Sequence, residues 1–448
     1  DLVIEVAIVR PGPIQGQMVH PYLRRRMGEE EVTYPNDAIR AVLEKTLGVP
    51  IFQEQAMRLA VVAAGFTPGE ADQLRRAMAA WRRPGVIDQF RHKLLDGMQA
   101  NDLSEEFAQR LYQQIQGFGE YGFPESHAAS FALLVYASAW LKHHYPAAFA
   151  AALVNSQPLG FYAPAQLVRD ARDHGVEVRP VDVNCSSWDC TLEPRDGELA
   201  SASGKSGTAL RLGLRMIDGL RETAGQTIEL AREAGPFTSI DDFARRTNLG
   251  QAVIKRLADA DAFGSLGTNR RQAVWQSLAQ EKKPKPLPLF DLLPLPPGEG
   301  RGEGALPPMS LREEVVADYR SAGLSLRAHP ISFHRRELDQ LGITPAGRLP
   351  ELKNGAPVRV AGLVLLRQRP GTAKGITFVT LEDETGTVNL VVRQRTWDRY
   401  YHIARSAPAW IAHGHVQTAE SVIHVVVRRL EALAEGLGAL EVKSRDFR

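Results

Sequence analysis

The chain has 448 residues, of which 44% are hydrophobic and 24% are charged, and its formal net charge at neutral pH is +2. This composition is ordinary for a globular protein of about three domains. It excludes a globally basic nucleic-acid binder, and no run approaches the roughly 18 apolar residues of a membrane span. No signal peptide opens the sequence. We therefore expect a cytoplasmic location and no membrane partner.

The amino-terminal part, residues 1–157, is predicted to be mainly helical, with glycine and proline at its breaks. It starts at Asp1, and the apolar run from Leu2 to Val9 is expected to be a strand or a buried segment. A start inside such a run indicates a fragment of a longer protein.

A predicted helix from Leu103 to Gln116 has apolar residues four positions apart and is expected to end at Gly117 as its carboxy-terminal cap. The six residues from Gly117 to Gly122 match the G-x-G-x-x-G fingerprint of dinucleotide-binding folds. That fingerprint requires a preceding strand. A helix precedes it here, so this motif alone does not support an oxidoreductase of that class.

Ser126 and His127 lie at the start of a second predicted helix, which runs to about Tyr145 and is expected to be largely buried. Backbone N–H groups and the positive end of the helix dipole make a helix start an anion site. We therefore predict a phosphate there. The alternative for His127 by itself is a hydrogen-bonded core histidine.

Six segments of the sequence carry a joint resemblance to one protein family. In chain order they are Arg10 to Pro13, Ile51 to Gln55, Ala71 to Met78, Tyr121 to Ser130, Tyr319 to Pro330 and Phe378 to Glu384. The first four resemble the fingers region of bacterial C-family DNA polymerases, the replicative alpha-subunit family. The motifs FPESH, YRSAGLSLRAHP and FVTLEDE resemble its error-prone, damage-tolerance branch in particular.

The resemblance implies that Arg75, Arg76, Ser126 and His127 face the triphosphate of the incoming dNTP, with Arg10 a weaker candidate. Guanidinium groups suit phosphate oxygens because they bind in a two-pronged way. The alternative for Arg75 and Arg76 is a solvated basic face, since adjacent helical residues point about 100° apart.

Gln53 and Gln55 are expected near these triphosphate-facing residues, at the nascent base pair. In the family, a palm domain precedes this region and its aspartates hold Mg²⁺. We find no pair of acidic residues on adjacent strands here, so we expect no catalytic residue, no bound metal and no polymerase activity from this fragment alone.

Residues 158–204 are predicted to extend the fingers, with a helix from Pro164 to His174 and a short strand around Val176 to Val183 that Pro180 interrupts. Cys185 and Cys190 lack a second pair, so we expect reduced cysteines rather than a zinc site.

Residues 205–280 are predicted to form tandem helix-hairpin-helix motifs. Gly219 and Arg221 stand at the first hairpin, ahead of a helix from Glu222 to Ala234, where backbone N–H groups point at a DNA phosphate. Leu249 to Gly267 is a degenerate second copy, for which a packing role remains open. Asp241-Asp242 is interpreted as the acidic first turn of a helix capped by Thr238 and Ser239.

Residues 281–309 are predicted to be a linker, because twelve of the 25 residues from Pro284 to Pro308 are proline or glycine. Leu289 and Phe290 within it resemble peptides that dock on the sliding clamp, although the usual leading glutamine is absent. The alternative is that they pack on the protein's own surface. Residues 310–348 are a helical connector.

Residues 349–433 show five period-two runs with a helical insert near Trp397 to Ile403, which predicts an OB-fold, followed by a tail at residues 434–448. A basic groove with aromatic groups would bind single-stranded DNA. The alternative is a barrel that acts only as a spacer. The residues expected to supply these groups are Arg367, Arg369, Lys374, Phe378 and Arg393.

The predicted fold class is thus multidomain α+β, with helical fingers, a tandem helix-hairpin-helix region and a carboxy-terminal OB-fold. The expected function is the dNTP- and DNA-binding part of an error-prone polymerase in DNA repair and translesion synthesis. Its expected partners are primer–template DNA, single-stranded DNA, dNTP, the sliding clamp and other damage-tolerance polymerase proteins. The alternative is a non-enzymatic DNA-binding and clamp-tethering module, against which the intact Arg75, Arg76 and His127 argue.

Overall fold

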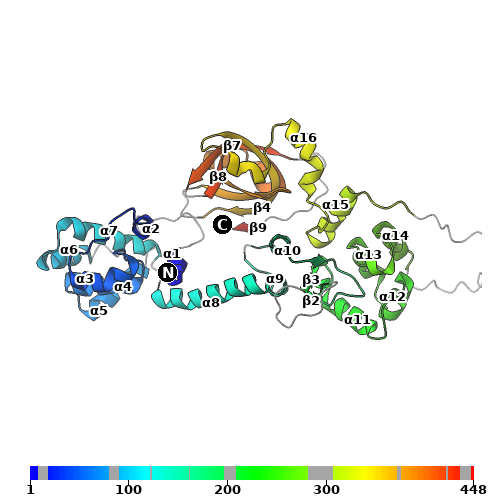
Figure 1. Cartoon of the computed structure of the whole chain (residues 1–448), viewed down its shortest axis with the longest axis horizontal. Coiled ribbons are helices and arrows are strands. Elements are labelled where there is room, and N and C mark those ends of the chain that lie inside the picture. The colour runs from blue at the N-terminus through cyan, green and yellow to red at the C-terminus, as the bar shows by residue number, and fades with distance from the viewer. Residues whose placement is uncertain are drawn as a thin grey trace, which may run out of the picture. The chain divides into compact units, whose positions relative to one another are not determined.

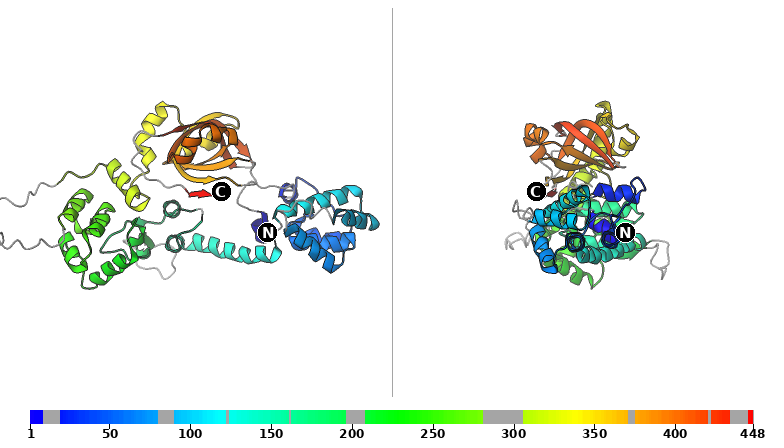
Figure 2. Two further views of the ribbon diagram at one scale, coloured as in Figure 1. Left: turned by 180° about the vertical axis from the view of Figure 1, so that it is seen from behind. Right: turned by 90° about the vertical axis from the view of Figure 1, so that its left-hand side faces the viewer.

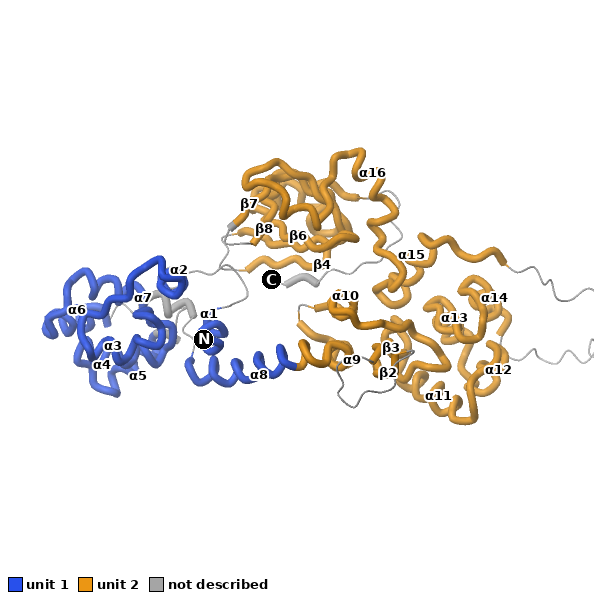
Figure 3. The backbone as a smooth tube through the Cα atoms, viewed as in Figure 1, with its two compact units in different colours: residues 1–140 blue, residues 141–448 orange. Residues whose placement is uncertain are grey.

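The computed structural model divides into two units, residues 1–140 and residues 141–448 (Figure 3). The structure describes residues 1–8, 19–79, 90–121, 124–160, 162–195, 208–280, 306–370, 375–419, 422–433 and 445–447.

The first unit is helical (Figure 1). Its principal core joins α3, α4, α5, α6 and α7 through residues such as Leu59, Leu74 and Leu111. At Gly97 a Cβ atom would lie 2.1 Å from the carbonyl oxygen of Ala64, so only glycine allows α6 to pass this close to α4. The helices are α1 (Leu2–Ile8), α2 (Val19–Arg26), α3 (Asp37–Leu43), η1 (Glu44–Thr46), α4 (Gln53–Ala64), α5 (Pro68–Ala79), α6 (Arg91–Ala100), α7 (Glu105–Tyr121) and α8 (Glu125–His144).

Three expectations for this region need correction. The opening apolar run is a helix, α1, and not a strand, although its buried Ile4 and Ala7 agree with the other expectation, a buried segment. Helix α7 continues through Tyr121, so Gly117 lies within it and does not cap it. Helix α8 is mostly exposed, with Leu133 at 71% and Tyr136 at 63%, and among its described residues Ala128 and Ala132 are buried. Helices α7 and α8 form and begin near the predicted residues, whereas the predicted burial of α8 is wrong.

The second unit begins with α9 (Pro146–Asn155) and α10 (Pro164–Asp173), which pack on a small sheet of β1 (Val178–Arg179), β2 (Thr191–Pro194) and β3 (Thr208–Arg211). The strand order is β1-β3-β2. The strand predicted around Val176 to Val183 is β1, which is only two residues long because Pro180 follows it directly. Both cysteines are free, and the buried Cys190 accepts a hydrogen bond from the Gly213 N–H.

The next four helices, α11 to α14, share one core with α9, α10 and the small sheet, and this core includes Phe243, Phe263 and Leu257. As predicted, Ser239 caps α12 by accepting a hydrogen bond from Asp242 N, and Asp242 pairs with arginines rather than standing free for a metal. The elements are η3 (Leu214–Met216), α11 (Glu222–Arg232), α12 (Ile240–Thr247), α13 (Gln251–Asp259), η4 (Gly264–Leu266), α14 (Arg270–Leu278), α15 (Leu311–Ala322), η5 (Pro330–His334), α16 (Arg335–Gln340) and η6 (Ala346–Glu351).

A closed barrel completes the second unit, seen from opposite sides in Figures 1 and 2. Its strand order is β5-β6-β8-β7-β4-β9, and pairing of β5 with β4 closes it. Trp410 is fully buried at its centre. The elements are β4 (Pro357–Gln368), β5 (Thr377–Glu382), β6 (Thr387–Val392), α17 (Gln394–Arg399), α18 (Tyr401–Ser406), β7 (Ala409–Ala419), β8 (Val422–Ala432) and β9 (Arg445–Phe447).

The barrel has five strands with a helical insert between the third and fourth, so the predicted OB-fold and the α+β class are confirmed. Strand β9 adds a short parallel pairing with β4 in what was predicted as a tail. In the part of the chain that the structure describes, no helix combines the length and the apolar character of a membrane span.

Candidate functional site

The first turn of α8 exposes Ser126 and His127, so the alternative of a core histidine does not hold. The backbone N–H of Glu125 donates to Oε2 of Glu54 at 2.9 Å. Ala128 packs in one cluster with Ile51, Phe52 and α1. Two motifs that lie far apart in the sequence therefore meet, and a carboxylate already occupies part of the helix start, as the helix dipole favours.

Gln55 is buried and bonded inside the protein, which argues against its predicted role at the nascent base pair. Its side chain is 6% exposed. Oε1 accepts from the N–H groups of Ile51 (2.9 Å) and Phe52 (3.1 Å), and Nε2 donates to Val42 O and Thr46 Oγ1. All four positions of the amide are used to fix the loop that precedes α4. Gln53, two residues earlier, is partly exposed, and its predicted role stays a prediction.

Arg75 and Arg76 both bind Asp72 on the preceding turn of α5. Nη2 of Arg75 lies 2.8 Å from Oδ1, and Nη2 of Arg76 lies 2.9 Å from Oδ2. The hydrogen bond from Arg75 is the main reason why the pKa of Asp72 is lowered. Two adjacent arginines can therefore converge on one anion of carboxylate size, despite the angle between them on the helix.

The predicted triphosphate residues thus form two described groups in the first unit, one at Glu54 and the start of α8 and one at Asp72 on α5. Helices α4 and α5 pack against each other. Arg10 lies outside the described residues, as do the clamp candidates Leu289 and Phe290.

The first hairpin turn has Gly219 at φ +71°, a conformation that favours glycine. Helix α11 starts directly after it, with Arg221 as an exposed N-cap residue and no side-chain hydrogen bond to its first turn. Arg256 of α13 donates from Nη1 to Gly219 O at 2.7 Å. The sequence did not single out Arg256, because its proximity depends on how α13 folds back onto the turn.

The turn of the second hairpin faces the protein itself. The Ser265 N–H donates to Oδ2 of Asp182 at 2.8 Å, and Asn184 Nδ2 donates to Ser265 Oγ at 3.0 Å. A carboxylate of the chain thus holds a backbone donor of this turn. These contacts favour the packing alternative for the second copy.

Arg367 is buried and bonded inside the barrel, which argues against its predicted role as a DNA contact. Its side chain is buried (residue 7% exposed) and donates to the carbonyl oxygens of Ala404 (2.9 Å) and Ala407 (2.8 Å) at the end of α18. Its guanidinium also lies 5.4 Å from the ring centroid of Trp410. From the sequence alone, an arginine on a strand suggests a basic surface. Here its hydrogen bonds join the inserted helix α18 to the barrel strand β4.

The other described barrel candidates come together. Phe378 pairs with Gln368 on β4 and with Val391 on β6, at the ends of those strands. Arg369 directly follows Gln368, and Arg393 follows Val392, the residue after Val391. Both arginines are exposed. Val379 is 1% exposed and faces the core, so the ring of Phe378 is on the outer face. Lys374 lies outside the described residues.

No three His, Cys, Asp or Glu side chains among the described residues gather in a way that could hold a metal ion. The described side chains therefore do not fit the Mg²⁺ that nucleotidyl transfer requires. Metal-dependent chemistry is not assigned to them.

Three family models match the chain in sequence order. Residues 1–102 match the bacterial DNA polymerase III alpha subunit finger domain, residues 175–273 a helix-hairpin-helix motif, and residues 358–433 an OB-fold nucleic acid binding domain. The order agrees with the helical unit, the hairpins and the barrel. The amino-terminal part of the chain is therefore similar to the finger domain of that polymerase subunit.

Individual relatives give a more specific similarity than the family models do. An error-prone DNA polymerase of Rhodopirellula baltica is 61% identical over the whole of this chain, which covers 38% of that protein. One from Methylococcus capsulatus is 54% identical, with 43% of its length covered. Over its whole length the chain is therefore similar to proteins named error-prone DNA polymerases, and it spans about two fifths of the length of these relatives.

Among solved structures, asparaginyl-tRNA synthetase from Pyrococcus horikoshii matches a fifth of the chain at 27% identity and a TM-score of 0.18. A similarity this low says nothing about the function of the chain.

Proposed function

We propose that this chain is the part of an error-prone DNA polymerase that binds the incoming dNTP and the DNA. The observation that carries the proposal is the pair of polar groups in the fingers unit. One presents a helix start that already binds a carboxylate, and the other presents two arginines converging on one carboxylate. Both are suited to phosphate oxygens.

The two carboxylates act in this proposal as internal anions that the triphosphate replaces. Glu54 holds only the first N–H of α8, which leaves the turn that bears Ser126 and His127 facing outward. Asp72 is partly exposed, at 34% of its side chain, so Arg75 and Arg76 can exchange it for a stronger anion without breaking a core contact. The residues orient the triphosphate, while the metal and the catalytic carboxylates belong to the part of the polymerase that this chain does not span.

DNA is held, in this proposal, by the first hairpin and by the outer face of the barrel around Phe378. The hairpin offers phosphate contacts through Gly219 and Arg221, and the barrel offers base stacking and the charges of Arg369 and Arg393. The proposal includes DNA repair and translesion synthesis in the cytoplasm, with the sliding clamp and other damage-tolerance polymerase proteins as partners, and the names of the error-prone relatives support it.

A titration of the purified chain with dATP, dAMP and inorganic phosphate tests the nucleotide part of the proposal. We expect dATP to bind most tightly, and Arg76→Ala or His127→Ala to weaken it. Glu54→Gln should tighten binding, because it removes the competing charge at the helix start. Arg40→Ala, which removes an exposed arginine on α3 paired with Glu44, is the matched control. Equal binding of dATP by the wild type and all four variants would contradict the proposed site.

A further inference from the structure

Helix α15 and the residues just after it pack on two parts of the second unit. Leu324, which follows the helix, is buried in the core that α9 to α14 share with the small sheet, named here the hairpin core. Val316 and Tyr319 of the helix pack instead against a cluster that contains Leu363 of β4 and Ile411 of β7. Helix α15 therefore contacts both the hairpin core and the barrel.

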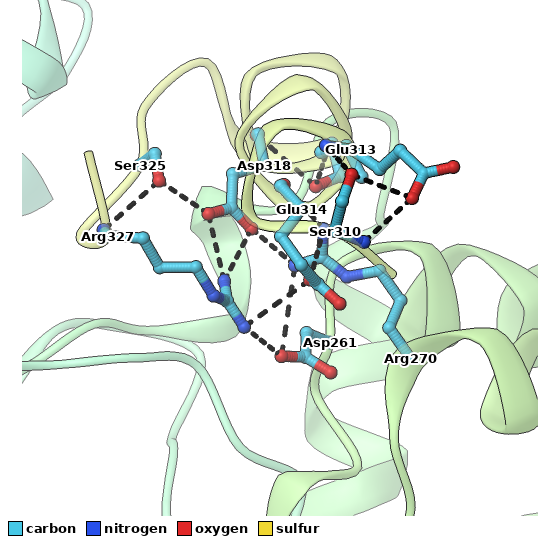
Figure 4. A network of polar contacts seen from close by, with 10 residues as sticks. Asp261, Arg270, Ser310, Glu313, Glu314, Asp318, Ser325 and Arg327 are labelled. Atoms are coloured by element: carbon cyan, nitrogen blue, oxygen red, sulfur yellow. Dashed lines mark hydrogen bonds and ion pairs between the residues drawn. The ribbon is translucent and has the colours of Figure 1, made fainter. Parts of the chain in front are cut away.

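An ion network attaches α15 and the loop after it to the hairpin core (Figure 4). Arg270, at the start of α14 and 2% exposed, pairs with Asp318 and donates to Glu314 O at 2.8 Å. Arg327, in the loop, donates from Nη1 to both carboxylate oxygens of Asp318 at 2.9 Å. Its Nη2 pairs with Asp261, which lies just after α13. The network thus joins α15 and its loop to α13 and α14.

A second ion group attaches the same loop, and also α10, to the barrel. Glu382, the last residue of β5, is 7% exposed. Its Oε2 lies 3.8 Å from Nε2 of His329 in the loop, and its Oε1 pairs with Arg169 of α10. Arg169 also donates to Asp383 O at 3.4 Å. Because α10 belongs to the hairpin core, the barrel is held to that core both directly and through the loop.

Closely spaced residues of α15 and the loop serve these two ion groups. Asp318 bonds to the hairpin core, whereas burial and the nearby charge of Glu382 raise the pKa of the next residue, Tyr319. In the loop, Arg327 bonds on the hairpin side and His329 on the barrel side. Neighbouring helical residues point about 100° apart, so one turn of α15 can reach both sides. The hairpin core and the barrel therefore cannot shift against each other without breaking one of the two groups.

Buried ions are a poor source of stability by themselves, because each ion loses its hydration. What the network supplies is one defined placement, since Asp318 must meet Arg270 and Arg327 together. A linker over residues 281–309, as the sequence predicts, would by itself leave the hairpins and the barrel free to bind DNA independently. The two ion groups therefore point to a role that needs the hairpins and the barrel in one fixed relation.

We propose that α15 and the loop after it, residues 311–330, form a joint that couples DNA binding by the first hairpin to DNA binding by the barrel. Arg327 is the positioning residue of this joint, because it bonds α15 to the hairpin core next to the point where His329 meets the barrel. The ligand that fits a coupled pair is junction DNA, in which a duplex for the hairpin continues as a single strand for the barrel. This inference rests on the proposed binding of DNA by both surfaces.

Coupling should appear as an extra affinity for junction DNA, because the second contact then forms within one complex. Coupling between two sites of one protein is typically about fivefold to 150-fold. The test measures three labelled probes by fluorescence anisotropy on the whole chain, at one salt concentration: the junction DNA, its duplex part alone and its single-stranded part alone. We expect the wild type to bind the junction at least roughly tenfold more tightly than either part.

Arg327→Met tests the joint, because it keeps the length of the side chain but removes its pairs with Asp318 and Asp261. We expect the Kd for junction DNA to rise about tenfold, while the Kd for each separate part stays as in the wild type. Unchanged hydrogen exchange in α11 to α14 should show that the hairpin core is still folded. Arg348→Met is the matched control, since Arg348 pairs with Glu351 in the same turn and both side chains are mostly exposed. It should bind all three probes like the wild type.

Arg169→Met is a second variant, which keeps the test valid if Arg327→Met loosens the hairpin core. It removes the pair between α10 and Glu382 on the barrel side of the joint. We expect it also to weaken binding of junction DNA without changing the binding of the separate parts. Equal losses for all three probes in both variants would show that the ion groups only stabilise the fold, and would overturn the joint. An unchanged Kd for junction DNA in both variants would overturn it as well.

The wild type alone separates this inference from the function on which it rests. If it binds the duplex and the single strand, but binds the junction no more tightly than the better of the two, the surfaces are not coupled. The joint is then refuted, while the proposed DNA binding stands. If the wild type binds neither the duplex nor the single strand, the DNA part of the proposed function fails, and the joint fails with it.

Discussion

Replacing Arg367 by alanine should destabilise the barrel rather than weaken its grip on DNA. The side chain makes two charge-assisted hydrogen bonds to the end of α18 and a cation–π contact with Trp410. Hydrogen bonds to charged groups contribute about 1.5 to 3 kcal/mol each, and a desolvated cation–π contact up to about 2 kcal/mol. Because these terms overlap, we expect a loss of about 3 to 5 kcal/mol.

Hydrogen exchange of the barrel strands in the whole chain measures this loss locally, since unfolding of a multidomain chain is not a single two-state event. Anisotropy with labelled single-stranded DNA, over a series of KCl concentrations, gives the binding slope of the variant below its unfolding transition. Arg369→Ala is the matched control, because Arg369 is two residues away and exposed. It should leave exchange unchanged and reduce the slope by about 0.7. A stable Arg367→Ala protein with a reduced slope would refute the reasoning.

Three more predictions concern residues whose surroundings the structure defines. Gln55→Leu should destabilise the fingers unit by about 2 to 4 kcal/mol, because it leaves two buried N–H groups unpaired; unchanged thermal melting with altered dNTP selectivity would restore the base-pair role. Phe378→Ala should weaken single-stranded DNA binding by about 1 to 3 kcal/mol without changing hydrogen exchange, whereas Val379→Ala should accelerate exchange in β5. Burial raises the pKa of Glu382, but His329 and Arg169 together lower it by more. The pKa of Glu382 therefore lies below its ordinary value. The stability that Glu382 contributes should therefore be present at neutral pH and lost as the pH falls below that value, and Glu382→Gln should flatten this acid limb of the unfolding curve.

The element types were readable from the sequence wherever pattern and local chemistry agree. The cap at Ser239, the helix from Pro164 and the alternation that puts Val379 inside are examples. Gly117 was misplaced because a glycine can end a helix but does not oblige it to end, and here α7 continues through it. The segment after Asp1 was ambiguous because seven apolar-rich residues suit a strand or a buried helix equally.

The site could be predicted less completely than the fold, because side-chain partners come from distant parts of the chain. Sequence patterns placed His127 at a helix start, but nothing local showed that Glu54 would bind there. Arg256 became part of the hairpin only through the return of α13, and Arg367 was drawn inside by carbonyl groups of an inserted helix. The FVTLEDE motif also has a distant partner that the sequence did not indicate, since its Glu382 pairs with Arg169, more than two hundred residues earlier.

The central claim is that the fingers unit recognises the triphosphate of the incoming nucleotide. Steady-state primer extension by the full-length polymerase that contains this chain, with Arg76→Ala and His127→Ala, tests it most directly. Loss of one charge-assisted contact costs about 1.5 to 3 kcal/mol, so each variant should raise the KM for dNTP by roughly tenfold to a hundredfold. Its Kd for primer–template DNA should not change. Equal losses in nucleotide use and DNA binding, or an unchanged KM, would contradict the account.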